Sequence, residues 1–213
     1  RNWHCPNLNR PSPPVPGGIV MTTLKPAPAA QVAAVQLVNY LERLGVERVF
    51  GMCGHSLVQV LDALSRSRVR FISCRHEQLA AHIADGYARV SGKTGVVLTH
   101  VGPGLTNAIT GIATASLDCI PMVVITGNVQ SYCHGRGPHQ EVNLNADNDQ
   151  IEMCRPICKR VYRVPRAADL PRGMERGAAA PPRVRVFSPP WVDHPGYGRH
   201  IDLGVKGAPG DVG

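Results

Sequence analysis

Residues 95–126 read GVVLTHVGPGLTNAITGIATASLDCIPMVVIT and hold two apolar runs separated by a helical segment. The runs at 95–99 and 122–126 lack polar alternation, which is typical of strands buried on both faces of a parallel sheet. A Gly-Pro-Gly turn at 102–104 precedes a predicted helix over 105–117. A strand, a helix and a strand in this order predict a βαβ unit.

The same alternation continues upstream of this unit. Apolar residues recur every three residues from Val32 to Leu44, and Gly45 then marks the end of a helix. Further strands are predicted over 46–50 and 69–72, and further helices over 57–64 and 76–91. Residues 31–165 are therefore predicted to form a doubly wound α/β domain. Its sheet should be mostly parallel, with helices on both faces and functional loops at the carboxyl ends of the strands.

Both flanks of this domain are rich in proline and lack an apolar period. Residues 1–30 contain seven prolines, which predicts a disordered leader or translated sequence upstream of a start at Met21. Residues 166–213 contain seven prolines and eight glycines, which predicts an irregular tail. The abrupt loss of periodicity suggests a truncated chain whose tail is GC-rich DNA read in another frame.

Charge and cysteine content argue against several classes of function. The net charge of +8 is spread along the chain without a dense basic run, so we expect no nucleic-acid partner. The seven cysteines form no C-x-x-C pair, so we expect free thiols and no metal site. No apolar run reaches the roughly 20 residues of a membrane span, so we expect no membrane partner. Free thiols persist in a reducing compartment, which favours a cytoplasmic location.

Glu77 is the main candidate for chemistry. It follows the predicted strand that ends near Ile72 and lies in the first turn of the helix over 76–91. A carboxylate there lies at the edge of the sheet where α/β proteins bind ligands. An acidic residue in a first turn also complements the helix dipole, so its position alone does not assign a function.

The residues around Glu77 resemble the glutamate segment of thiamine diphosphate enzymes. The matching segments, in chain order, are Val49-Phe50-Gly51 with Gly54, Arg75-His76-Glu77-Gln78, Ala84-Asp85-Gly86-Tyr87-Ala88-Arg89, Gly102-Pro103-Gly104 with Thr106-Asn107, Gly111-Ile112-Ala113-Thr114-Ala115, Asp118-Cys119-Ile120-Pro121-Met122 and Ile125-Thr126-Gly127. Over roughly 31–165 the chain thus resembles the N-terminal pyrimidine-binding domain of acetolactate synthases and benzoylformate decarboxylase-like enzymes. The match is expected to stop near 165–176.

The resemblance implies a cofactor, a substrate class and a role for Glu77. In this family the glutamate hydrogen-bonds N1′ of the aminopyrimidine of thiamine diphosphate and favours its imino tautomer, which activates the thiazolium carbon for attack on a 2-keto acid. A glutamate in this role should be shielded from water. Gly102, Pro103 and Asn107 are implied to lie beside the pyrimidine. The turn at 102–104 is a weak phosphate cradle by itself, since it is neither G-x-G-x-x-G nor a Walker loop.

His100 is a second catalytic candidate. It follows the strand at 95–99, and benzoylformate decarboxylase, by resemblance, has a proton-transferring histidine at the same distance before the asparagine. The alternative is a histidine that caps the loop. His55, Ser56 and Gln140 are implied to line the substrate pocket, although a helix N-cap also explains Ser56.

The family binds the diphosphate and Mg²⁺ on a second domain, through Gly-Asp-Gly and a later Asn-Asn, and this sequence contains neither. Acetolactate synthases also bind FAD on a central domain, so FAD belongs to the full-length family. Two functions stay open. The first is a half of a carboligase or decarboxylase (transferase or lyase), inactive as this single chain and completed by a homodimer or a partner chain. The second is a non-catalytic truncated or orphan domain that folds and dimerises without turnover.

Overall fold

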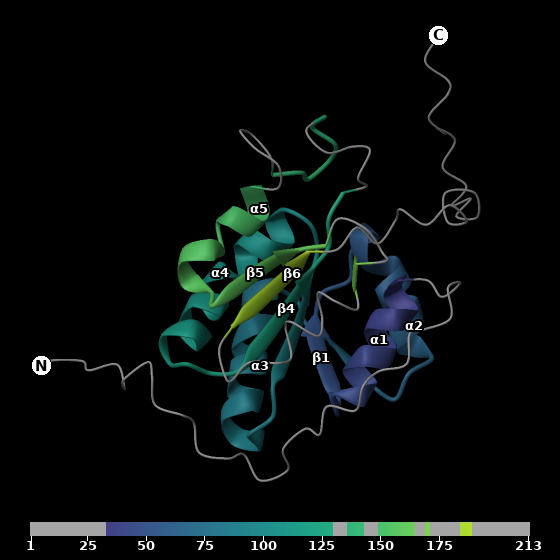
Figure 1. Ribbon diagram of the computed structural model, residues 1–213, viewed down its shortest axis with the longest axis vertical. Coiled ribbons are helices and arrows are strands. Elements are labelled where there is room, and N and C mark those ends of the chain that lie inside the picture. The colour runs from purple at the N-terminus through teal and green to yellow at the C-terminus, as the bar shows by residue number, and fades with distance from the viewer. Residues whose placement is uncertain (1–32, 130–135, 143–148, 165–168, 171–183, 189–213) are drawn as a thin grey trace, which may run out of the picture.

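The computed structural model describes residues 33–129, 136–142, 149–164, 169–170 and 184–188. Six parallel strands form one sheet in the order β2-β1-β3-β4-β6-β5 (Figure 1). The strands are β1 (Arg48–Gly51), β2 (Arg70–Ser73), β3 (Gly95–Thr99), β4 (Met122–Thr126), β5 (Arg160–Arg163) and β6 (Arg185–Ser188). The predicted doubly wound, parallel α/β fold is confirmed.

Helices cover both faces of the sheet (Figure 1). They are α1 (Ala33–Arg43), α2 (Val58–Ser65), α3 (Glu77–Ser91), α4 (Pro103–Leu117) and the short α5 (Asp149–Glu152), with 3₁₀ turns η1 (His55–Leu57) and η3 (Arg155–Ile157). The helix predicted over 105–117 begins earlier, at Pro103, because proline is well tolerated in the first turn, where no amide donor is required.

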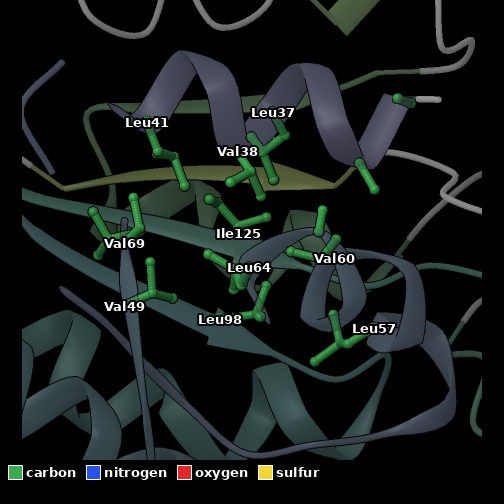
Figure 2. Close-up of a cluster of buried hydrophobic side chains, with 14 of the residues drawn as sticks. Leu37, Val38, Leu41, Val49, Leu57, Val60, Leu64, Val69, Leu98 and Ile125 are labelled. Carbon is green, nitrogen blue, oxygen red and sulfur yellow. The ribbon is translucent and has the colours of Figure 1, made fainter. Parts of the chain in front are cut away.

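Each face of the sheet has its own apolar core. Leu37 and Leu41 of α1 pack with residues of α2 over Leu98 and Ile125 (Figure 2). On the opposite face, α3 and α4 pack small residues and Ile112 against Val97 and other strand residues. All five residues of β3 are buried; Val96 and Leu98 belong to one core and Val97 to the other. The absence of polar alternation in β3 follows from this burial on both sides.

The strand order creates a switch point between β1 and β3. The chain leaves β1 through α2 on one face to reach β2, and it leaves β3 through α4 on the other face to reach β4. The turns after β1 and β3 therefore begin side by side at the carboxyl edge of the sheet and lead to helices on opposite faces. Parallel α/β proteins bind ligands at such a point.

The structure differs from the sequence prediction at residues 185–188, which lie in the predicted irregular tail. These residues form β6, which pairs with β4 on one side and β5 on the other. Val184 and Val186 are fully buried. A four-residue strand flanked by proline-rich sequence is too short to give a visible period, and its pairing with β4 is a non-local event. The predicted leader lies outside the described residues.

None of the described helices is both long and apolar enough to cross a membrane. Nor does the described part of the chain bring three His, Cys, Asp or Glu side chains together as metal ligands.

Candidate functional site

Glu77 is held at the carboxyl edge of the sheet by the start of α3. His76 caps this helix through its Nδ1, which accepts a hydrogen bond of 3.2 Å from the amide of Gln78. Only 2% of the Glu77 surface is exposed, which confirms that the carboxylate is shielded from water. A charged group this buried requires a bound partner or a functional reason for its position.

The two carboxylate oxygens of Glu77 have different surroundings. Asn107 Nδ2 donates a hydrogen bond of 3.1 Å to Glu77 Oε2. Among the described residues, Oε1 has no hydrogen-bond partner. A Cβ atom built on Gly104 would lie 3.2 Å from Oε1, so a larger residue there would crowd the carboxylate. One oxygen is thus oriented by the protein, while the other has no bond to a described residue.

His100 follows β3, is 8% exposed and, like Glu77 Oε1, lies close to Gly104. Its Nδ1 is 2.5 Å from Ser56 Oγ, and its Nε2 is 2.6 Å from Gln140 Oε1. Ser56 Oγ also accepts a hydrogen bond of 3.2 Å from the amide of Val101. The imidazole therefore joins the turn after β1, the turn after β3 and the segment 136–142.

Ser56 does not cap a helix, and that interpretation is wrong. It lies inside η1, and neither η1 nor α2 has a side-chain cap. Its hydroxyl is instead occupied by His100 and Val101. His100 likewise binds two side chains and no backbone amide of the loop, so the structure does not support a loop cap.

The cluster formed by Ser56, His100 and Gln140 fits because three neighbouring residues are glycines without a Cβ atom. A Cβ atom on Gly54 would lie 2.6 Å from His100 Nδ1. A Cβ on Gly127 would overlap Ser56 Oγ, and a Cβ on Gly102 would overlap the carbonyl oxygen of Gln140. Gly102 has φ +60°, a conformation that L side chains seldom adopt. These turns can therefore approach one another only because they lack side chains.

His55 adds a second imidazole to the cluster. Its ring centroid is 4.4 Å from that of His100, edge to face, and 6.4 Å from that of His139. Burial lowers the pKa of His55, and repulsion from His100 and His139 lowers it further. The environment favours the neutral form of His55.

Gln150 holds the edge together but is not identified from the sequence. Only 1% of its surface is exposed. Its Oε1 accepts from the amide of Gly102 at 2.7 Å, and its Nε2 donates to the carbonyl of Gly127 at 3.0 Å. The Asn- and Asp-rich sequence around it is typical of a loop and gives no sign that one side chain is buried.

The structure thus brings together most of the residues predicted for the site. Glu77 and Asn107 are bonded to each other, and His100 contacts Ser56, Gln140 and His55. Pro103 is exposed at the first position of α4.

A buried, oriented carboxylate at the carboxyl edge of a parallel sheet defines a ligand-binding domain of the doubly wound α/β class. Residues 31–153 match the family described as thiamine pyrophosphate enzyme, N-terminal TPP binding domain. The chain belongs to this family.

Known relatives are large subunits of acetolactate synthase. The one from Buchnera aphidicola of Schizaphis graminum is 47% identical over 139 residues, which cover 65% of this chain and 23% of that protein. Isozyme 3 from Escherichia coli K12 is 40% identical over 144 residues, covering 67% and 24%. The Corynebacterium glutamicum protein is 33% identical over 226 residues, covering 94% and 35%.

The chain spans about a quarter to a third of the length of these curated relatives. Because the Corynebacterium alignment takes in 94% of the chain, it extends past residue 176, where the resemblance is expected to stop.

Proposed function

We propose that residues 31–165, together with β6, bind the aminopyrimidine ring of thiamine diphosphate and that Glu77 hydrogen-bonds its N1′ atom. The observation that carries this proposal is the asymmetric carboxylate. Asn107 orients Oε2, whereas Oε1 has no partner among the described residues and faces the space that Gly104 leaves. A carboxyl group fits a heterocyclic nitrogen that must gain and lose a proton.

Bound thiamine diphosphate would supply the carbon nucleophile and the electron sink for the reaction of a 2-keto acid. The protein's own residues would control the proton at N1′ of the pyrimidine. Glu77 holds or releases a proton at pyrimidine N1′, and Asn107 keeps its carboxyl group in one plane. Burial of Glu77 excludes the water that would compete for this hydrogen bond. Gly102, which precedes α4, and Pro103, its first residue, would lie beside the ring.

We further propose a carboligase or decarboxylase that acts on a 2-keto acid. The relatives named acetolactate synthase support this class. His55, Ser56 and Gln140 contact His100 at the switch point, where α/β proteins bind ligands. Proton transfer by His100 would require one ring nitrogen to leave Ser56 or Gln140.

We propose that the diphosphate and Mg²⁺ bind on a second domain or a partner chain, since the family's Gly-Asp-Gly and Asn-Asn motifs do not occur in this sequence. FAD, where the full-length enzyme uses it, would also bind outside this domain. We propose a homodimer or a hetero-complex as the active form. A cytoplasmic location is part of this proposal and is supported by the free cysteines in the described residues.

The test uses the pyrimidine alone, 4-amino-5-hydroxymethyl-2-methylpyrimidine, so that the diphosphate site is not needed. Saturation-transfer NMR should detect binding to the whole chain. The matched control ligand has carbon in place of N1′ and should bind at least about tenfold more weakly, the factor that one lost hydrogen bond of about 1.4 kcal/mol implies. Equal binding of the two ligands would refute the role of Glu77. Failure of both to bind, alone and with thiamine diphosphate and Mg²⁺, would favour the non-catalytic domain.

A further inference from the structure

A chain of hydrogen bonds connects three segments at the switch point. Ser56 follows β1, His100 follows β3, and Gln140 lies in the segment 136–142. We propose that His100 is a positioning residue, fixed as its neutral Nε2–H tautomer, which orients the side-chain amide of Gln140. This deepens the proposed function, because Gln140 is there taken to line the substrate pocket.

The carbonyl oxygen of the Gln140 side chain determines where the protons lie. It can only accept, so His100 Nε2, 2.6 Å away, must carry the shared proton. In a neutral ring Nδ1 then has a free lone pair, and the Ser56 hydroxyl donates to it across 2.5 Å. Ser56 Oγ keeps a lone pair for the amide of Val101. His100 Nε2–H, the Ser56 hydroxyl and the Val101 amide thus each have an acceptor.

The backbone around His100 allows its ring little freedom. The ring lies next to Gly54, where a Cβ would be 2.6 Å from Nδ1, and the His100 Cβ lies 2.8 Å from the Cβ position of Gly104. The carbonyl of His100 accepts a hydrogen bond of 3.3 Å from the Thr126 hydroxyl. A side chain held on both sides and at its backbone is suited to orienting another group.

Gln140 has an unusual backbone that also indicates a fixed position. Its φ is +65°, a left-handed conformation that is uncommon for residues other than glycine. Its carbonyl oxygen fits against Gly102 only because that residue has no Cβ. Such conformations persist where the surroundings enforce them, and they cluster at ligand sites.

The bond to His100 leaves the amide N–H groups of Gln140 for another acceptor. Within the described residues they have none, and Gln140 is half-buried. A carboxylate or carbonyl oxygen of a 2-keto acid is an acceptor of the required kind. His100 itself has both ring nitrogens bound to protein, so the geometry assigns it to orientation rather than to direct proton transfer.

The first test measures the His100 tautomer by NMR on the whole ¹⁵N-histidine-labelled chain without ligand. His100 is assigned by the loss of its signals in His100→Gln. We expect a pyrrole-type shift for Nε2 and a pyridine-type shift for Nδ1. Ser56→Ala and Gln140→Leu should each move the ring toward a mixture of tautomers, whereas His82→Gln should leave the His100 signals unchanged. A His100 ring protonated at Nδ1 alone, or one indifferent to both partner substitutions, would overturn the proposal.

The second test follows the side-chain amide of Gln140 in a ¹⁵N-labelled chain during titration with pyruvate. We expect its signals to shift in the unmodified protein and in His100→Gln, whose amide N–H replaces the donor on Nε2. In His100→Phe the donor is absent, and the pyruvate response should fall at least tenfold. The proposed role is contradicted if pyruvate does not shift the Gln140 amide signals of the unmodified protein. It is also contradicted if these signals shift equally in His100→Gln and His100→Phe. Neither NMR test depends on pyrimidine binding. The proposal for His100 can therefore fail while the role of Glu77 holds, and the role of Glu77 can fail while the proposal for His100 holds.

Discussion

The side-chain amide of Asn107 donates a hydrogen bond of 3.1 Å to Oε2 of Glu77, although 30 residues separate them in sequence. Asn107 lies one turn into α4, and Glu77 begins α3. These two helices pack side by side on one face of the sheet, joined by small residues such as Ala81 against Gly111. The orientation of the buried carboxylate thus depends on close packing between two helices.

Replacing Glu77 with glutamine should separate binding from activation. The glutamine can still accept a bond from Asn107 and contact N1′, but it cannot exchange a proton with the ring. When the chain is combined with a diphosphate-binding domain of a relative, the rate of deuterium exchange at the thiazolium carbon should fall at least about 100-fold, the lower bound for a lost acid–base group. The matched control is Glu47→Gln, which precedes β1 at the opposite edge and should leave exchange unchanged. Near-normal exchange in Glu77→Gln would exclude the assigned role.

Asn107→Leu should weaken pyrimidine binding without unfolding the chain. The substitution removes the donor to Glu77 Oε2, so the carboxyl group loses its fixed plane. A loss of about 1 kcal/mol of binding free energy, which is typical of one hydrogen bond, corresponds to an approximately fivefold larger dissociation constant in calorimetry. Thr110→Leu, an exposed position one turn further along α4, should bind as the unmodified chain does. Unchanged binding in Asn107→Leu would show that Glu77 is oriented by something else.

Gly127→Ala should destabilise the domain, because the new methyl group overlaps Ser56 Oγ. Overpacking of this kind costs about 1–3 kcal/mol in the free energy of unfolding, measured by urea titration. Gly86→Ala is the matched control, since a Cβ there meets nothing within 4 Å and the residue is inside α3. That change should stabilise the chain by about 0.5–1 kcal/mol. A neutral Gly127→Ala would mean that the two turns are not packed as described.

The stability of the chain should fall as the pH is lowered through the titration range of His55. Burial, helped by His100 and His139, holds the pKa of His55 below its ordinary value in the folded state. The unfolded chain therefore binds the proton more readily, so the stabilisation is complete above the unfolded pKa of about 6.5 and is lost below it. Urea midpoints between pH 7.5 and 5 should depend less on pH in His55→Gln than in the unmodified chain. His82→Gln serves as the control, and an identical slope in His55→Gln would show that this residue does not contribute.

Local patterns in the sequence predicted the helices and strands from α1 to β4. The uninterrupted apolar run at 95–99 predicted a strand buried on two faces, and β3 is buried at every position. Gly45 and Gly92 predicted the ends of α1 and α3, and both have positive φ. The position of Glu77 after a strand and at a helix start predicted a carboxylate at the edge of the sheet. Each of these signals lies within a few consecutive residues.

Only the tertiary structure decided which side chains meet. Ser56 and His100 are 44 residues apart, and they touch because β1 and β3 are neighbours whose helices depart to opposite faces. The burial of Gln150 and the pairing of β6 between β4 and β5 are likewise absent from any local pattern. Helix and strand periods report which face of an element is apolar, whereas the crossover connections of a parallel sheet determine which turns converge. The residues that we propose for the site lie at or beside those turns.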